Sequence, residues 1–495
     1  MRTTKRHHLL FCTFLILTTF SWTGCTLFKR AAAPEAKPRE LNILAVNDIH
    51  ATLPNFPRFA YMVDSLRGIY PGLLLVSGGD NQTGNPLNDQ YIPKGLPVIE
   101  LMNALRFDIS AVGNHEFDTN GENNPLDVLV RKANFDFISA NTVLPRADFP
   151  FKTHKIMRMP SGLKVGFTSL LDINSGNIPD THPDRVREFR FKDPLQVGME
   201  MVSLKDSCDL LIYLNHYGFG NDVELAKKLP AGKVDLIIGG HSHTTIDTEQ
   251  VHNNILITQA GSKLKYATLI NVVILPGGEV KKTMKLLPVG QKGNIRPEIQ
   301  KMVERYQADS PLKELVAKAE EDFTSSEQLG YLMVDAYKWS TGADIALANP
   351  GSIRMDRLSK GDISLIDVYT LDPFGNEMIL INLTGHEMRE MMLAGFDMDE
   401  RRPIVPSGLK LDYTLNADGG VEDVKLSNPD GSPFDMDKVY KVVMSSYMSV
   451  TYKYKHSDPG HSTFRTTAEG LIDYLRHLKT VPSYRKEHRI SGAKV

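Results

Sequence analysis

A short apolar run followed closely by polar or glycine residues recurs along residues 41–257. Short apolar runs that end in polar or glycine residues are typical of buried β-strands, and the longer segments between them are typical of helices and loops. The pattern therefore predicts an α/β first domain built on a largely buried sheet. The predicted strands are Leu41–Val46, Leu73–Val76, Ile109–Val112, Phe135–Ala140, Val165–Leu171, Leu210–Leu214, Leu236–Ile238 and Ile255–Ile257.

Five of these runs are followed, directly after their carboxyl ends, by Asp, Asn or His residues. In an open α/β sheet this edge is where ligand sites form, because loops from distant parts of the chain converge there. We therefore expect these side chains to share one site. They are Asp48 and His50 after the first run, Asp80 after the second, Asn114 and His115 after the third, His216 after Leu214, and His241 and His243 after Ile238.

The residue types at these strand ends point to metal binding. Imidazole nitrogens combined with carboxylate and amide oxygens suit borderline divalent ions such as Zn or Mn. Asp48 and His50 lie two residues apart on an extended chain, so their side chains share one side, and His241 and His243 repeat this spacing. The candidates are too many for one tetrahedral ion. They suit two ions that share a bridging carboxylate, an arrangement used for in-line displacement at phosphorus.

Length and charge exclude other classes of protein. The chain has 495 residues, which predicts at least two domains. Its 57 Lys+Arg against 59 Asp+Glu give a formal net charge of −2, which argues against a nucleic-acid partner because polynucleotide binding through bulk electrostatics needs a large basic excess. We expect a small-molecule substrate and no obligate protein partner.

The first 25 residues are predicted to be an export signal. A basic start precedes the apolar run 9–20, which is too short to span a bilayer comfortably. Thr23-Gly24-Cys25 then resembles a bacterial lipobox, so Cys25 is the predicted lipidation site, and a plain secretory signal cut nearby is the alternative. Residues 26–40 are rich in Ala, Pro and charge, as expected of a tether. This predicts a protein exported to the cell envelope and held at the membrane only by that lipid. Cys208 is expected to be a buried, inert thiol.

The rest of the chain divides into three predicted parts. Residues 41–290 form the first domain, residues 291–322 a polar helical linker broken near Ser310-Pro311, and residues 323–495 a second domain. In the second domain we expect a helix over Ser326–Ser340 and a strand over Val439–Ser445.

The ordered series D-x-H, G-D, G-N-H-E-x-D, N-H and G-H-x-H, read from residues 48–50, 79–80, 113–118, 215–216 and 240–243, resembles the calcineurin-like metallophosphoesterases. The fuller match is to their 5′-nucleotidase branch, whose bacterial members are periplasmic UshA-like enzymes. The resemblance implies an N-terminal four-layer β-sandwich flanked by helices and a C-terminal α/β substrate-binding domain. It also implies two divalent metal ions and a nucleotide substrate.

The resemblance implies a role for each residue of the first domain. One metal would be held by Asp48, His50 and His243, the other by Asn114, His216 and His241, with Asp80 bridging the two. The catalytic pair would be His115, which stabilises charge developing on the phosphate, and Asp118, which holds the imidazole. A histidinium that faces phosphoryl oxygens needs such a carboxylate partner. Glu116 is expected to be structural.

Two segments of the second domain resemble the family's substrate site. Asn349-Pro350-Gly351-Ser352-Ile353-Arg354 resembles an N-x-G-x-x-R loop, and residues 373–376 match P-F-G-N. This implies that Arg354 contacts phosphate, that Asn349 and Asn376 contact base or sugar, and that Phe374 stacks on the base. Two family features are missing: the arginines before the first helix of this domain, and the G-G-D-G loop. Tyr452 or Tyr454 is the candidate for the second aromatic of the base clamp.

We therefore expect an exported dinuclear phosphohydrolase that releases phosphate from nucleoside 5′-monophosphates by attack of a metal-activated water. Three alternatives use the same scaffold. They are a phosphodiesterase or UDP-sugar or 2′,3′-cyclic nucleotide hydrolase, a thiosulfohydrolase, and a non-catalytic surface binding protein.

Overall fold

The computed structural model describes residues 37–121, 124–290, 294–308, 310–399 and 401–492. The predicted signal segment, Cys25 and most of the predicted tether lie outside these residues. Within the described ranges, no helix combines the length and the apolar character needed to cross a membrane.

The first domain contains a seven-stranded sheet. Its strands β1 to β4 and β6 are parallel. Beyond β1 the sheet continues with β14, which is antiparallel to β1, and then β15, which is antiparallel to β14. Successive parallel strands therefore end at one edge. The order is β15 (Val280–Pro288), β14 (Tyr266–Ile274), β1 (Arg39–Val46), β2 (Leu74–Ser77), β3 (Ile109–Ala111), β4 (Asp136–Ile138) and β6 (Phe151–Lys152).

A second, six-stranded sheet packs on the first. Its central strands β13, β11, β10 and β8 are parallel, and β12 and β7 are antiparallel edge strands. The order is β12 (Gln250–His252), β13 (Ile255–Thr258), β11 (Leu236–Ile238), β10 (Leu210–Leu214), β8 (Lys164–Thr168) and β7 (His154–Arg158). A two-stranded sheet of β5 (Thr142–Val143) and β9 (Arg190–Phe191) lies beside them.

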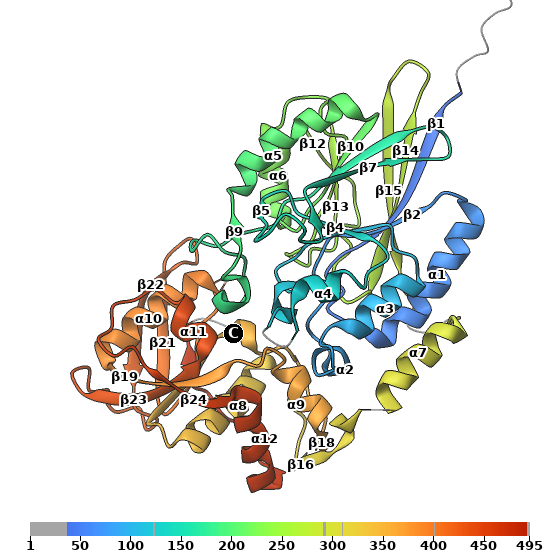
Figure 1. Cartoon of the computed structure of the whole chain (residues 1–495). Coiled ribbons are helices and arrows are strands. Elements are labelled where there is room, and N and C mark those ends of the chain that lie inside the picture. Colours follow the sequence, from blue (N-terminus) through green and yellow to red (C-terminus); the bar gives the residue numbers. More distant parts are fainter. Residues whose placement is uncertain (1–36, 122–123, 291–293, 309, 400, 493–495) are drawn as a thin grey trace, which may run out of the picture.

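Alternation along the strands explains the layering. Leu41, Ile43 and Ala45 of β1 point into an apolar core shared with the second sheet, whereas Leu44 and Val46 point into a core shared with helices. The helices over the first sheet are α1 (Phe56–Ile69), α3 (Leu96–Ala104) and α7 (Pro297–Ala308), and those over the second are α5 (Pro194–Met201) and α6 (Phe219–Lys228). The predicted four-layer sandwich flanked by helices is confirmed (Figure 1).

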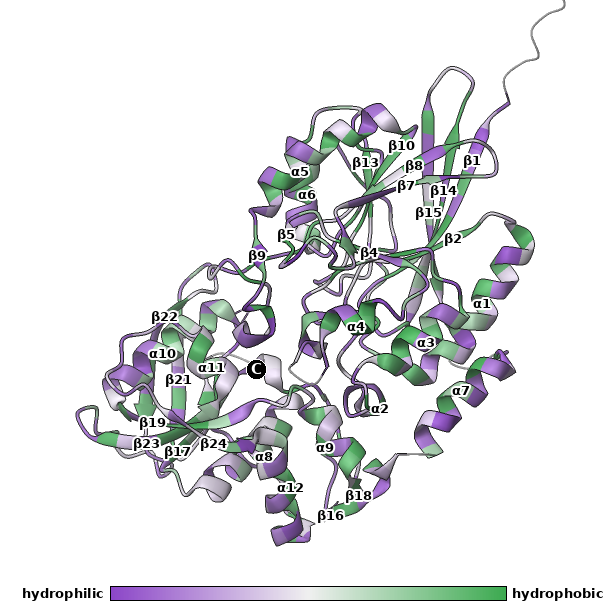
Figure 2. Cartoon of the chain, in the orientation of Figure 1, coloured by the Kyte–Doolittle hydropathy of each residue, from purple (hydrophilic) through white to green (hydrophobic). Residues whose placement is uncertain are grey.

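The second domain has three layers around a five-stranded sheet. Along β17, Ala346 and Ala348 face α8 and α12, whereas Ile345 and Leu347 face α10. Figure 2 shows apolar residues on the inner sides of these helices. The sheet order is β20 (Val405–Ser407), β17 (Ile345–Ala348), β23 (Val439–Ser445), β19 (Glu377–Thr384) and β24 (His461–Thr466), and the helices are α8 (Ser326–Thr341), α10 (Gly385–Met398) and α12 (Thr467–Leu478).

Smaller elements complete this domain. Two three-stranded sheets are β18-β16-β25 and β22-β21-β26. Their bounds are β16 (Leu315–Ala319), β18 (Gly361–Ser364), β21 (Lys410–Leu415), β22 (Val421–Ser427), β25 (Thr480–Val481) and β26 (Ile490–Ser491), and the short helices of the chain are α2 (Pro86–Asp89), α4 (Leu126–Val130), α9 (Leu365–Leu371) and α11 (Ser446–Thr451).

The predicted helical linker is helical in only part of its length. Residues 297–308 form α7, whose Ile299, Val303 and Tyr306 join the core of the first domain. Residues 315–319, expected to be helical, are instead strand β16, paired with β18 and β25. Helix-forming residues gave the wrong expectation there because pairing with two strands outweighs intrinsic propensity.

Candidate functional site

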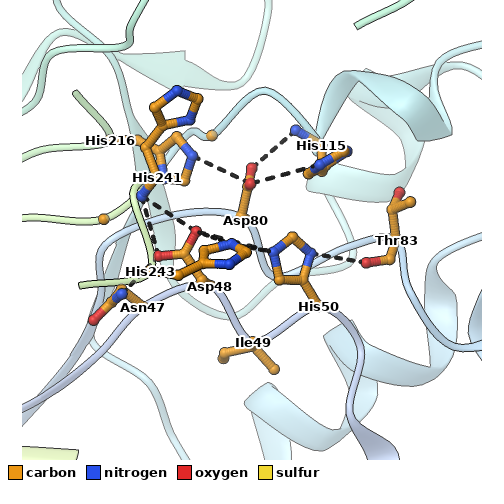
Figure 3. A network of polar contacts seen from close by, with 12 residues as sticks. Asn47, Asp48, Ile49, His50, Asp80, Thr83, His115, His216, His241 and His243 are labelled. Atoms are coloured by element: carbon orange, nitrogen blue, oxygen red, sulfur yellow. Dashed lines mark hydrogen bonds and ion pairs between the residues drawn. The ribbon is translucent and has the colours of Figure 1, made fainter. Parts of the chain in front are cut away.

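The loops at the carboxyl edges of the two stacked sheets bring the predicted metal ligands together. Asp48 and His50 follow β1, Asp80 follows β2 and Asn114 follows β3 in the first sheet. The remaining candidates, His216 after β10 and His241 and His243 after β11, come from the second sheet. Figure 3 shows the side chains of Asp48, His50, Asp80 and the surrounding histidines facing one another.

One group of donors consists of Asp48, His50 and His243. The Nε2 atoms of His50 and His243 are 2.9 Å apart, and Asp48 Oδ1 lies 3.3 Å from His243 Nε2 and 4.0 Å from His50 Nε2. Neighbouring ligands of a tetrahedral zinc ion are separated by about 3.3 Å, given bonds of about 2.0 Å. The spacing of these three donors therefore fits a divalent ion.

A second group lies around Asn114. Its Oδ1 is 3.2 Å from His216 Nε2 and 3.1 Å from His241 Nδ1. Asp80 Oδ2 is 3.2 Å from His216 Nε2, and Asp80 also falls within one donor cluster with His50. Asp80 therefore lies between the two groups, where a shared carboxylate would have to be.

The far ring nitrogens of two histidines are held by backbone carbonyls. His50 Nδ1 lies 3.0 Å from the carbonyl oxygen of Thr83, and His216 Nδ1 lies 2.8 Å from that of Gly78. A carbonyl only accepts, so each Nδ1 carries the proton and each Nε2 is left to face the other donors. This is the tautomer that a metal-binding histidine requires.

The electrostatics of the cluster favour a positive charge. Burial lowers the pKa of His216, but the carboxylate of Asp80 outweighs burial and raises that pKa to about 10. Burial raises the pKa of Asp80, yet His216 and His115 hold it well below its usual range. The buried carboxylates thus stabilise a cation among them, which fits a divalent metal.

Backbone strain is concentrated at the same residues. Asp48, His50, Asp80, His241 and His243 have φ values of 50°, 46°, 50°, 76° and 53°. Left-handed backbone at a residue other than glycine costs about 1 kcal/mol or more, and it persists where the surroundings enforce it. Five of the seven predicted ligands adopt it, as expected where side-chain direction matters more than local stability.

Glycines let these loops approach closely. A Cβ at Gly113 would lie 2.2 Å from Asp80 Oδ1, and one at Gly240 would lie 2.5 Å from the carbonyl oxygen of Gly78. Contacts this short are forbidden, so the loops after β2, β3 and β11 pack only because these positions lack a side chain.

His115 and Asp118 form the predicted pair. His115 Nδ1 lies 2.6 Å from Asp118 Oδ2, Thr181 donates a hydrogen bond to Asp118 Oδ1 over 2.7 Å, and His115 Nε2 is 3.9 Å from Asp80 Oδ2. Burial lowers the pKa of His115, but Asp80 and Asp118 outweigh it and leave the pKa above its ordinary value. A charged imidazole is therefore favoured at this position.

Glu116 supports the loops that carry the site. Its buried carboxylate accepts hydrogen bonds from the backbone N–H groups of Asp80, Asn81 and Gly113 over 3.1, 2.8 and 2.6 Å. Glu116 thereby ties the end of β2 to the end of β3, in agreement with its expected structural role.

Two supporting residues were not predicted. Asn47 donates to Asp48 Oδ2 over 2.6 Å, and Asp172 Oδ2 lies 3.5 Å from His241 Nε2. Asp172 directly follows the predicted strand Val165–Leu171, so the strand-end signal that identified the other residues was present there too. Asn47 stands one residue before a ligand, where nothing in the spacing distinguishes it.

A cavity of about 920 Å³ joins this cluster to the second domain. Four of the predicted substrate-binding residues line it, namely Asn349, Arg354, Phe374 and Asn376. The Arg354 guanidinium carbon is 5.6 Å from the centre of the Phe374 ring, and that ring stacks on His115 with centroids 6.0 Å apart. The second domain therefore places a cation and an aromatic face beside the candidate catalytic histidine.

Tyr452 does not lie in this cavity. Its side chain is buried in the second domain's core, and its hydroxyl donates a hydrogen bond to Asp399. Tyr447, five residues earlier on α11, lines the cavity instead. The helix α11 (Ser446–Thr451) decides which tyrosine faces the cavity, and no pattern in the sequence predicted that helix.

Two family models match the chain. Residues 41–245 match the calcineurin-like phosphoesterase model, and residues 306–452 match the model of the 5′-nucleotidase C-terminal domain. The two matches follow the order of the domains in the structure.

Individual relatives agree with these matches. The 5′-nucleotidase of Vibrio cholerae and protein UshA of Escherichia coli are each 26% identical to this chain, covering 92% and 93% of it and 93% and 94% of their own lengths. The trifunctional nucleotide phosphoesterase YfkN of Bacillus subtilis is also 26% identical, over 88% of this chain but 33% of its own length.

Solved structures share the fold. A 5′-nucleotidase precursor from Thermus thermophilus superposes with a TM-score of 0.78 at 25% identity, covering 92% of this chain and 99% of that one. A sulfate thiohydrolase, SoxB, superposes with a TM-score of 0.73 at 15% identity, covering 91% and 96%. The second similarity shows a shared fold alone.

Proposed function

We propose that this chain, which belongs to the 5′-nucleotidase family of calcineurin-like metallophosphoesterases, releases phosphate from nucleoside 5′-monophosphates in a reaction that depends on divalent metal ions. The observation that supports this most directly is the shared cavity. It joins a cluster of nitrogen and oxygen donors in one domain to Arg354 and Phe374 in the other.

Two ions, zinc or manganese, are proposed from the two donor groups. Asp48, His50 and His243 would hold one ion, and Asn114, His216 and His241 the other, with Asp80 shared between them. Bound ions would lower the pKa of a coordinated water and neutralise charge on the phosphate.

Side chains that line the cavity would bind the substrate and stabilise the transition state. His115, charged and oriented by Asp118, would donate a hydrogen bond from Nε2 to a phosphoryl oxygen as negative charge develops. Arg354 would hold the phosphate through its guanidinium fork. Phe374 would stack on the base, and Asn349 and Asn376 would contact the base or sugar, with Tyr447 rather than Tyr452 as the second aromatic.

Export and lipid anchoring are proposed from residues 1–25 and the lipobox-like Thr23-Gly24-Cys25. If Cys25 is acylated, labelled palmitate is incorporated into the wild-type protein in cells and not into Cys25→Ala. Equal labelling of both proteins would contradict the anchor.

Hydrolysis of a substrate panel tests the proposed function. Phosphate release is measured for the nucleoside monophosphates, nucleotide release for the UDP-sugars and cyclic nucleotides, and sulfate release for the thiosulfate esters. We expect hydrolysis of nucleoside monophosphates to exceed that of UDP-sugars, cyclic nucleotides and thiosulfate esters. We expect chelator to abolish the activity and Mn or Zn to restore it.

His115→Ala should lower kcat about 10²–10⁴-fold while metal content stays unchanged, because the lost group acts on the transition state. A preference for diesters or sulfur esters would identify one of the alternative hydrolases. Absence of bound metal and of activity would identify a binding protein.

A further inference from the structure

The segment of residues 180–185, between β8 and β9, lies against the loop of residues 114–120, which contains the predicted catalytic pair. The side-chain amide of Asn120 donates to the carbonyl oxygen of Arg185 over 2.7 Å. The guanidinium of Arg185 donates in return to the carbonyl oxygen of Asn120 over 2.6 Å. Each residue thus binds the backbone of the other, so the segment and the loop are fixed to each other.

The first residue of this segment orients one of the proposed metal ligands. The side chain of Asn114 donates from Nδ2 to the carbonyl oxygen of Asp180 over 2.9 Å. Because a carbonyl oxygen only accepts, the NH₂ group of Asn114 must point toward Asp180. Its Oδ1 is then left to face His216 and His241, which lie 3.2 and 3.1 Å away. The backbone of Asp180 makes this contact, so it does not depend on the side chain of the next residue.

That next residue, Thr181, binds the carboxylate of the predicted pair. Its hydroxyl lies 2.7 Å from Asp118 Oδ1, while His115 Nδ1 lies 2.6 Å from Asp118 Oδ2. A carboxylate only accepts, so the hydroxyl of Thr181 is the donor. Thr181 is buried beside the cavity that it helps to line. Among the residues that the structure describes, no side chain other than these two donates a hydrogen bond to Asp118.

The second of these hydrogen bonds fixes the plane of the carboxylate. The outer side-chain torsion of an aspartate has a broad minimum, so its rotamer alone leaves the carboxylate free to turn. A donor at each oxygen prevents that rotation of Asp118. The orientation of the carboxylate in turn sets the direction of the His115 ring, whose Nε2 lies 3.9 Å from Asp80 Oδ2 and so faces the proposed metal centre.

We propose that Thr181 is a positioning residue for the reaction, because its hydroxyl fixes Asp118, and Asp118 fixes the imidazole of His115 toward the phosphoryl group. This inference rests on the proposed function, in which His115 donates a hydrogen bond to a phosphoryl oxygen as charge develops. Thr181 acts only through Asp118 and does not contact the phosphate. Its loss therefore affects the transition state more than the binding of substrate.

Thr181→Val removes the hydroxyl at nearly constant shape. With AMP as substrate, we expect kcat to fall about tenfold or more and KM to change less than about twofold, because a hydrogen bond to a charged group is lost while the groups that bind substrate remain. Thr181→Ser keeps a hydroxyl and should retain most of the wild-type kcat. Metal content should stay unchanged in both variants, since the backbone of Asp180 still binds Asn114.

Thr341→Val is the matched control. It removes a hydroxyl that donates over 2.7 Å to the carbonyl oxygen of Tyr337 at the end of α8, in the second domain. This variant should keep the wild-type kcat and KM. A wild-type kcat in Thr181→Val as well would overturn the proposal.

A double-mutant cycle shows whether Thr181 acts through Asp118. In the Asp118→Ala protein, Thr181→Val should cause no further fall in kcat, because the carboxylate that Thr181 fixes is already gone. A fall as large as that in the wild-type background would overturn the proposal, since Thr181 would then act on the substrate or on the fold directly.

The proton between His115 and Asp118 gives a readout that needs no activity. In protein with isotope-labelled histidine, the Nδ1–H of His115 should give a downfield proton resonance, assigned by its absence from Asp118→Ala. We expect this resonance to broaden through exchange with water in Thr181→Val and to persist in Thr181→Ser and Thr341→Val. An unchanged resonance in Thr181→Val would overturn the positioning role. Hydrolysis of no nucleotide by the wild-type protein would overturn the proposed function, and the resonance distinguishes that result from a failure of the positioning role.

Discussion

At the scale of the residue, side chains next to the proposed metal ligands hold those ligands in place. Asn47 and the backbone N–H of His241 both donate to the carboxylate of Asp48, whose Oδ1 also faces His50 and His243. Asp172 stands behind His241 in the same way and is itself held by Asn221 over 3.3 Å. Such partners set ring orientation and basicity, so they affect metal affinity without touching the metal.

Asp172→Asn tests this arrangement. We expect metal affinity to fall about 10–100-fold, the range for partners of metal-binding histidines, because the amide weakens the hold on His241. Titration of chelator-stripped protein with Zn or Mn in a calorimeter measures the change. Asp206→Asn, which alters a surface ion pair with Lys233, is the control. Equal affinities in both variants would show that Asp172 does not position the histidine.

At the scale of the element, the site residues lie in loops that follow short strands of two stacked sheets. Glycines in these loops allow the loops to approach one another closely. Strand predictions were accurate here: Leu210–Leu214 and Leu236–Ile238 match β10 and β11 residue for residue. Apolar runs bounded by polar residues identify buried strands because a strand that is covered on both faces needs apolar side chains at consecutive positions. Predictions from helix propensity were weaker, since residues 315–319 became strand β16 through pairing that no local pattern reveals.

Gly113→Ala tests the close approach of the loops after β2 and β3. The added methyl would lie 2.2 Å from Asp80 Oδ1 and must displace that carboxylate. We expect metal content and phosphate release to fall at least about tenfold, measured by elemental analysis and phosphate assay, because a misplaced ligand loses affinity. Gly72→Ala, where nothing lies within 4 Å of the new Cβ, should behave as wild type. Full metal occupancy in Gly113→Ala would contradict the assigned geometry.

At the scale of the whole molecule, two domains enclose one cavity, and α9 packs into both. Leu365, Ile366 and Tyr369 of α9 contact the first domain's core, while Val368 and Leu371 belong to the core of the second domain.

A buried carboxyl group near the site also links the stability of the fold to pH. Asp222 is completely buried beneath the site, Asn215 donates to its Oδ1 over 2.7 Å, and its Oδ2 has no partner among the described residues.

The cost of burying Asp222 should appear as a pH dependence of stability. Burial raises its pKa from 3.8 to about 7. The folded protein therefore keeps a proton that the unfolded chain has released, so stability falls as pH rises toward 7 and is flat above it. Relative to Asp222→Asn, wild type should lose about 2 kcal/mol between pH 5.5 and 8, from 1.5 pH units at 1.36 kcal/mol each.

Urea unfolding of both proteins at the two pH values, with chelator present so that metal binding does not vary, measures this difference. A wild-type curve that runs parallel to that of the variant would show that the carboxyl ionises freely in the folded state.

The sequence by itself determined the α/β class, the strands and the chemical type of the site. Strand burial and strand-end chemistry are local properties, so it could be predicted without a structure that one site gathers Asp48, His50, Asp80, Asn114, His216, His241 and His243. Only the tertiary structure decided which residues support them and which line the substrate cavity. Tyr447 and Asp399 carry no local signal that singles them out, and the strand-end position of Asp172 does not by itself show that it supports His241. Their positions depend on how separate loops and helices pack, and packing is a property of the whole chain.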